Sequence, residues 1–138
     1  MSSATEVAVL TVPPARAGEF WPHISQHIEK ALEYGWNTPE EVLTLIENAQ
    51  AQCWLAVKGD RVLGVWVTRI EQSERGRYCL VWLTGGERVH EWLHLVGDEV
   101  EPWARENGCE ELQLVGRKSW VRRLPEYKWT SVVLRKSL

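Results

Sequence analysis

No run in the sequence approaches the ~18 consecutive apolar residues that a membrane-spanning helix needs. The first residues, Met1 to Glu6, lack the basic start and the apolar stretch of a secretion signal. Cysteine is scarce as well, because Cys53, Cys79 and Cys109 are an odd number at wide spacings that fit neither a disulfide framework nor a metal site. These absences predict a cytoplasmic protein whose cysteines are small, buried apolar residues in a reducing compartment.

The residues that are present favour one folded domain over 1–138. Apolar residues make up 44% and charged residues 25%, which are ordinary values for a globular protein. Nine tryptophans stand against a single phenylalanine. We expect four of them, Trp54, Trp66, Trp82 and Trp103, to pack where a sheet meets its covering helix. The alternative is a platform on which a base or another ligand stacks.

Charge is distributed unevenly along the chain. Residues 1–111 hold nine Lys/Arg against eighteen Asp/Glu, whereas residues 112–138 hold seven Lys/Arg against Glu126 alone. The first segment therefore carries a net charge of −9 and the second +6. Such a basic end could bind a phosphate or an acidic phage or host protein, or it could simply be a solvated face. Nucleic acid is a poor candidate, because the sequence has no recognisable reading helix and its overall charge is −3.

Hydrophobic periodicity and turn residues predict ten elements. Apolar residues at spacings of three and four mark the helices, and Thr38-Pro39-Glu40-Glu41 has the pattern of a capping box. Tight turns make the central strands an antiparallel meander, and a helical crossover makes the next strand parallel. The expected elements are strand Glu6–Val12, helix Glu19 to near Gly35, a helix from Thr38, strands Cys53–Val57, Val62–Ile70 and Tyr78–Leu83, helix Glu87–Asn107, strand Leu112–Val115, short helix Ser119–Leu124 and strand Trp129–Leu134.

This order, β-α-α-β-β-β-α-β-α-β, gives an α/β (α+β) fold in which a mixed, mostly antiparallel sheet is flanked by helices. It resembles the GNAT superfamily of acyl-CoA-dependent N-acyltransferases over essentially the whole chain. The ending, with Gly116–Trp120, Leu124–Trp129 and Val133–Lys136, is similar to short GNAT-like proteins of tailed bacteriophages. The resemblance implies that the fourth and fifth strands splay apart and that acetyl-CoA lies in the gap. The phage-like ending implies a host cytoplasm or a virion as the location.

The cofactor residues that the resemblance implies are Gly85, Gly86 and Arg88, assisted by Arg117 and Lys118. GNAT enzymes usually carry a Gln/Arg-x-x-Gly-x-Gly/Ala loop before the long helix, and its N–H groups bind the pyrophosphate. This chain has the shorter Thr84-Gly85-Gly86-Glu87-Arg88 instead. The two glycines could expose backbone donors at a helix start, or they could simply make a tight turn.

The catalytic pattern is incomplete. Many GNAT enzymes place a proton-donating tyrosine five residues before the aromatic that opens the last strand. If Trp129 is that aromatic, the position holds Leu124, and Tyr127 does not match it. Glu71 is the candidate base, near the end of the third strand. Two hypotheses stay open, an acyl-CoA N-acyltransferase with a degenerate cofactor motif and a non-catalytic phage virion, assembly or host-interaction protein on the same fold.

His90-Glu91-Trp92-Leu93-His94 spells the H-E-x-x-H zinc pattern. A catalytic zinc site also needs a third protein ligand, and no histidine follows His94. Both histidines lie off the apolar stripe of the expected helix, as solvent-facing residues do. We therefore expect no metal site here.

Overall fold

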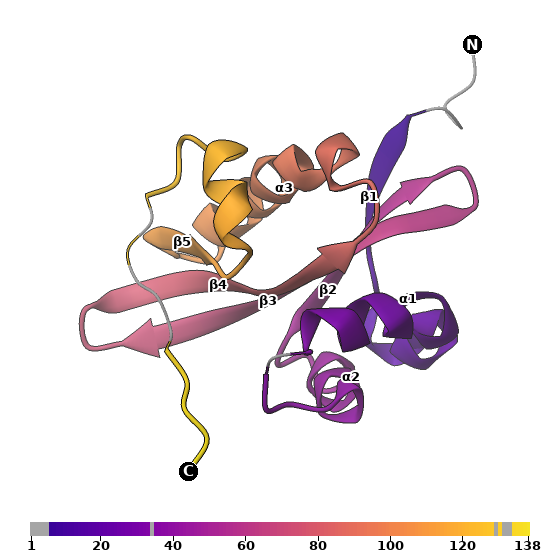
Figure 1. Ribbon diagram of the computed structural model, residues 1–138, viewed down its shortest axis with the longest axis horizontal. Helices are drawn as coiled ribbons and strands as arrows, with labels where there is room; N and C mark the ends of the chain where they lie inside the picture. Colours follow the sequence, from indigo (N-terminus) through magenta and orange to yellow (C-terminus); the bar gives the residue numbers. More distant parts are fainter. Residues whose placement is uncertain (1–5, 34, 129, 131–133) are drawn as a thin grey trace.

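The computed structural model describes residues 6–33, 35–128, 130 and 134–138 (Figure 1). Its elements are β1 (Val7–Thr11), the 3-10 turn η2 (Pro14–Arg16), α1 (Ala17–Ala31), α2 (Pro39–Glu47), β2 (Gln52–Lys58), β3 (Arg61–Ser73), β4 (Gly76–Gly86), the 3-10 turn η3 (Val89–Glu91), α3 (Leu93–Glu106), β5 (Glu111–Leu114) and the 3-10 helix η4 (Lys118–Arg122). The strands form one sheet in the order β1-β2-β3-β4-β5. α1 and α2 cover one face of the sheet, and α3 with η4 covers the other (Figure 1).

The predicted topology is confirmed for the described elements. β1 to β4 pair antiparallel in sequence, and β5 pairs parallel to β4 after the α3 crossover. The expected capping box is present at the start of α2, where Glu41 N–H donates to Thr38 Oγ1 at 3.2 Å and Thr38 N–H donates to Glu41 Oε1 at 3.1 Å. These two bonds satisfy backbone donors that a helix start leaves without intrahelical partners.

The sheet separates two apolar clusters. One lies under α1 and α2 and includes Ile24, Ile28, Leu55 and Val67. The other lies under α3 and η4, where indoles dominate. In that second cluster Trp54 meets Trp103 edge to face, with ring centroids 5.4 Å apart. The predicted packing of the tryptophans is confirmed: Trp54 and Trp66 are buried in the cluster under α3, and the half-buried Trp103 and Trp82 pack against the α3 and the α1/α2 clusters respectively.

The region after the fourth expected strand differs from the sequence-based expectation. β4 runs on to Gly86, and the predicted helix over Glu87–Asn107 is divided into η3 and α3, which begins at Leu93. The strand continues because Gly86 pairs with Gly64 across the β3–β4 ladder, and two facing glycines leave room for the indole of Trp92.

The C-terminal elements differ as well. The short helix expected over Ser119–Leu124 is 3-10 in type, and its N-cap is Arg117, which makes no side-chain cap bond. The strand expected over Trp129–Leu134 includes 129 and 131–133, which lie outside the described residues.

All three cysteines are free thiols, and Cys53 and Cys79 are buried as expected, while Cys109 is half-buried. Burial raises the pKa of the Cys53 and Cys79 thiols to about 12, the effect on Cys79 being reinforced by Cys109. Among the described residues, no helix combines the length and apolar character that crossing a bilayer requires.

Candidate active site between β4 and β5

The edge of β4 that faces β5 is paired over only part of its length. The last residue pair of the two strands is Val81 with Leu114, and Val115 N–H donates to the Val81 carbonyl at 3.0 Å. β4 then continues for five residues to Gly86, paired with β3 on its other side. At about 3.3 Å per residue, roughly 17 Å of β4 edge extends past β5. The β4 edge is therefore unpaired by β5 beyond Val81, where the resemblance places the gap between the fourth and fifth strands.

A β-bulge lies where the strands separate. Val67 pairs with Leu83 and Thr68 pairs with Val81, which leaves Trp82 as the extra residue on β4. Bulges bend the strand that carries them and increase its twist. The bulge thus lies at the point where the pairing of β4 with β5 ends.

Backbone groups at the end of β4 point toward the β5 side of the strand. Glu87 N–H donates to the Leu63 carbonyl at 2.8 Å, and the direction of backbone groups alternates along an antiparallel pair. The backbone groups of Gly86 and Thr84 therefore point toward the β5 side. The Thr84 hydroxyl and the indole N–H of its cross-strand neighbour Trp66 are buried without a hydrogen-bond partner in the described part of the chain. Unpartnered buried polar atoms are uncommon in native proteins.

The two glycines of the expected phosphate turn lie within β4. A Cβ on Gly85 would lie 2.7 Å from the His27 carbonyl of α1, so this position permits close packing of helix on sheet. Gly86 has φ +150°, and a Cβ there would lie 2.6 Å from Gly64 Cα. Both glycines are needed for close approach, and neither caps a helix.

Arg88 follows the strand in the left-handed conformation, with φ 54°. Its guanidinium donates to Glu91, whose carboxylate also accepts from Lys58 Nζ at 3.0 Å. The hydrogen bonds from Lys58 and then Arg88 hold the pKa of Glu91 below its ordinary value. Arg88 is thus already engaged by an acid of the same turn.

The neighbouring β2–β3 hairpin adds another pair, because Arg61 and Glu87 lie 2.6 Å apart. With Asp60 beside Arg61, this end of the sheet carries three cations, at Lys58, Arg61 and Arg88. Three carboxylates, at Asp60, Glu87 and Glu91, balance them. An anion would meet no net positive charge here unless a cation left its present partner.

Arg117 and Lys118 do not join Arg88. They follow β5, whose last residue Leu114 is level with Val81, at the opposite end of the gap from Gly86. Both are exposed, and Lys118 and Arg122 line a hollow of about 340 Å³ on the outer side of η4. The structure therefore divides the predicted cofactor residues between two places.

Glu71 lies on β3 opposite Tyr78 and three residues beyond Thr68, where the bulge ends. Its carboxylate is 3.5 Å from the Arg69 guanidinium, which in turn lies 5.0 Å from the centre of the Trp82 ring. Glu71 is half-buried and close to the bulge. A catalytic role for it stays a prediction.

Tyr127 does not occupy the position of the proton-donating tyrosine of GNAT enzymes, but its hydroxyl has an unusual environment. Its hydroxyl is buried without a hydrogen-bond partner in the described residues, and a Cβ on Gly97 of α3 would lie 3.1 Å from it. Burial, followed by the charges of Glu101, Glu126 and Asp98, raises the pKa of Tyr127 to about 12. The phenol is therefore neutral near pH 7 and keeps its proton. Sequence periodicity could not indicate a buried hydroxyl beyond Pro125.

The H-E-x-x-H pattern does not form a metal site in the described residues. His90 lies in η3 and His94 in α3, so the two histidines are not on one helix. No cluster of three or more His, Cys, Asp or Glu among the described residues could hold a metal ion. Glu91 of this motif binds Lys58 and Arg88 instead.

No protein-family model and no curated protein sequence matches the chain. Solved structures do match in fold. An aminoglycoside acetyltransferase, meta-AAC0020, from an uncultured soil metagenomic sample in complex with sisomicin has a TM-score of 0.70 at 12% identity, with 99% of each chain covered. A GNAT family acetyltransferase of Staphylococcus aureus has a TM-score of 0.67 at 9% identity, covering 96% of this chain and 99% of that one.

A third match is informative because its structure contains a cofactor. Aminoglycoside N-acetyltransferase AAC(6')-Iy in complex with CoA has a TM-score of 0.69 at 9% identity, covering 96% of this chain and 95% of that one. Identities this low establish the arrangement of helices and strands and nothing about substrates. Since each comparison covers nearly the full length of both chains, the chain has the fold of the GNAT acetyltransferases.

Proposed function

We propose that the chain is a cytoplasmic acyl-CoA-dependent N-acyltransferase that uses acetyl-CoA and an amine acceptor. The observation that supports this most is the edge of β4 from Trp82 to Gly86, which extends beyond β5 and carries the unpartnered, buried hydroxyl of Thr84. An open strand edge suits an amide-bearing arm, because its backbone groups can pair with the arm as a further strand would. The Thr84 hydroxyl is covered in the unbound chain and would reach the arm after the side chains that cover it move. The acetyltransferase names of the structural neighbours agree with the proposal.

The residues fit the arm of acetyl-CoA better than its phosphates. The backbone at Thr84 and Gly86 would hold the arm, with Gly85 keeping β4 close to α1. Arg88 would bind a phosphate after breaking its hydrogen bond to Glu91. Arg117 and Lys118 would supply positive charge at the other end of the unpaired β4 edge. When bound, the cofactor supplies a reactive acyl thioester.

Two side chains are candidates for proton transfer, one as a general base and one as a general acid. Glu71 would accept the proton of an amine through water, as a general base near the bulge. Tyr127 holds a proton on a hydroxyl whose pKa is raised to about 12 and which has no described acceptor. It is a candidate donor in place of the tyrosine that Leu124 replaces.

Calorimetric titration with acetyl-CoA tests the proposal. We expect a dissociation constant of roughly 1 μM to 1 mM, the usual range for enzyme substrates. Thr84→Val keeps the shape of the side chain and removes the hydroxyl, so it should weaken binding several-fold without loss of stability. Thr44→Val, at an exposed position of α2, is the matched control. No heat at about 1 mM acetyl-CoA would exclude the enzyme.

The non-catalytic alternative has one observation in its favour. Around η4, the exposed residues Arg117, Arg122 and Arg123 form no ion pair among the described residues. In a phage or prophage setting, this surface would bind an acidic virion, assembly or host protein, or a second copy. Sedimentation velocity and pull-down with the Arg122→Glu/Arg123→Glu variant test this, since loss of a wild-type complex in the variant would support it.

A further inference from the structure

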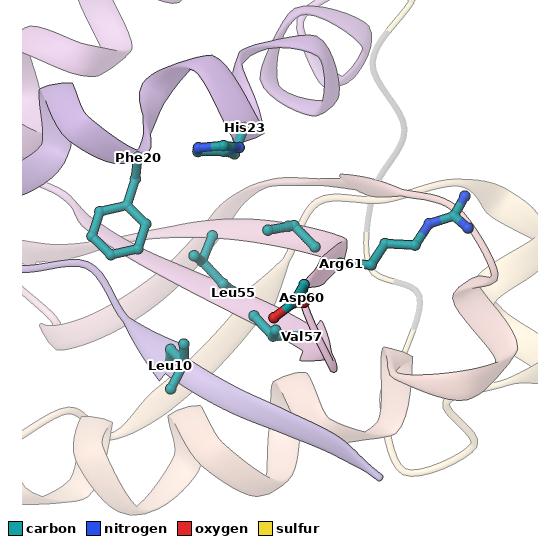
Figure 2. Close-up of a pocket in the computed structure, with 8 residues that line it drawn as sticks. Leu10, Phe20, His23, Leu55, Val57, Asp60 and Arg61 are labelled. Carbon is teal, nitrogen blue, oxygen red and sulfur yellow. The ribbon is translucent and has the colours of Figure 1, made fainter. Parts of the chain in front are cut away.

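A second hollow lies on the other side of the sheet from α3 (Figure 2). It has a volume of about 450 Å³, within the range of roughly 300–1,000 Å³ that is typical of small-molecule sites. Its apolar wall comes from four elements, β1, α1, β2 and β3, and consists of Leu10, Phe20, Leu55, Val57 and Val62. β3 and β4 separate it from β5, so it is distinct from the gap proposed for acetyl-CoA.

Three polar side chains complete the lining, His23 from α1 and Asp60 and Arg61 from the β2–β3 hairpin. Arg61 is committed to Glu87 at 2.6 Å, and in Figure 2 its guanidinium points away from the other lining side chains. Asp60 and His23 are exposed and form no hydrogen bond or ion pair with any described residue. Asp60 is therefore the acidic side chain of the lining that has no ion-pair partner among the described residues.

The wall of the hollow suits the apolar body of a ligand. The guanidinium of Arg16 already lies 5.4 Å from the centre of the Phe20 ring, so this ring has its cation–π partner and offers a ligand apolar contact. The unpaired carboxylate of Asp60 beside this apolar hollow attracts an ammonium group. A carboxylate ligand would be repelled by Asp60, and Arg61 would have to leave Glu87 to compensate.

The geometry points to a binding site for a small amine with an apolar body, held between α1 and the β2–β3 hairpin. The apolar body fills the space between Phe20, Leu55 and Val57, and the ammonium group lies at Asp60. This site is independent of the proposed acyltransferase activity. An amine would bind here in the absence of acetyl-CoA, and the site would remain if no acyl transfer occurred.

A pair of probes with the same 2-phenylethyl body and opposite charge tests the inference, 2-phenylethylammonium and 3-phenylpropanoate. Each is titrated into the full chain in an amide NMR experiment without acetyl-CoA. We expect the ammonium to shift resonances around Leu10, Phe20, Val57 and Asp60, with a dissociation constant of about 1–10 mM for so small a ligand. The carboxylate should bind about fivefold or more weakly, from one repulsive and one attractive charge in water.

Two variants locate the site. Asp60→Asn should remove the preference for the ammonium, whereas Asp98→Asn, the same change at an exposed position of α3, should keep it. Leu10→Trp should abolish binding of both probes by filling the hollow from a position that is 47% exposed and tolerates a larger side chain. Absence of shifts at about 20 mM ammonium would overturn the inference. Equal binding of the two probes, or a preference unchanged in Asp60→Asn, would also overturn it.

Discussion

The indole of Trp92 lies stacked on that of Trp66, with ring centroids 5.9 Å apart and planes 8° from parallel. Both are fully buried, and the indole N–H of Trp92 donates to the Glu87 carbonyl at 2.8 Å. The stack thus connects the centre of β3 to the turn that follows β4. It occupies the α3 side of the sheet beneath the proposed cofactor edge.

Gly64 makes room for this stack, and a methyl group there should be costly. A Cβ on Gly64 would lie 2.5 Å from Cζ2 of Trp92, in the middle of a packed core. We expect Gly64→Ala to lower the free energy of unfolding by about 1–3 kcal/mol through overpacking. Gly18→Ala is the control, because nothing lies within 4 Å of a Cβ there and alanine favours the helix. Urea unfolding curves measure both, and equal midpoints would contradict the packing argument.

The buried hydroxyl of Tyr127 should make stability fall in strong base. Its pKa is about 12 in the folded chain and about 10 when unfolded, so folding favours the protonated form. The stabilisation is complete below pH 10 and is lost as the pH rises from 10 towards 12. Tyr127→Phe should remove this part of the pH dependence and leave stability at pH 8 unchanged or higher, since the hydroxyl has no described partner.

Denaturation midpoints at pH 8, 10 and 11 provide the measurement for Tyr127. Cys53 and Cys79, whose pKa values are also raised to about 12, contribute to the slope in every variant. Comparison of Tyr127→Phe with Tyr78→Phe isolates the contribution of the Tyr127 hydroxyl to the pH dependence of the midpoint. If both variants follow the wild-type slope, the Tyr127 hydroxyl is solvated in solution.

Thiol reactivity should distinguish Cys109 from the other two cysteines. Cys53 is 2% exposed and Cys79 fully buried, and burial raises both pKa values to about 12, so almost no thiolate is present at pH 8. We expect Ellman's reagent to titrate one thiol quickly in the native protein and three in denaturant. Cys109→Ser should remove the fast phase, and a fast phase that persisted would show that a core cysteine opens to solvent.

The capping box at the start of α2 gives a smaller prediction. Thr38→Ala removes the acceptor of the Glu41 N–H and should cost about 1 kcal/mol of stability. Thr44→Ala, also in α2, removes a hydroxyl that donates to the Glu40 carbonyl and should be neutral or mildly stabilising, because alanine is the better helix former. Thermal unfolding of both variants checks the difference.

Most of the fold could be predicted because its signals are local. The spacing of Ile24 and Ile28, the Thr38 cap and the tight turn at Gly59-Asp60 each act within a few residues. The C-terminal boundary of β4 could not be predicted, because Gly85 and Gly86 have low strand propensity. They belong to the strand because they pair with Val65 and Gly64 of β3. Tertiary context decided that boundary.

The candidate site was harder to predict because charge pairing is not local. The sequence predicts that Arg88 binds a phosphate, but in the structure Arg88 donates to Glu91. Glu91 also accepts from Lys58, which is 33 residues from Glu91 in the sequence. The buried hydroxyls of Thr84 and Tyr127 are likewise invisible to periodicity, which ranks residues by polarity and not by whether an oxygen finds a partner.

The short parallel pairing of β5 has a dynamic consequence. Four residue pairs join it to β4, and the whole α3 crossover must be in place before they can form. We expect β5 to be the last strand to fold and the first to lose amide protection in hydrogen exchange. Partial unpairing of β5 would lengthen the part of the β4 edge that has no neighbouring strand. Local opening of this one short strand would therefore determine how much of the β4 edge a ligand can reach.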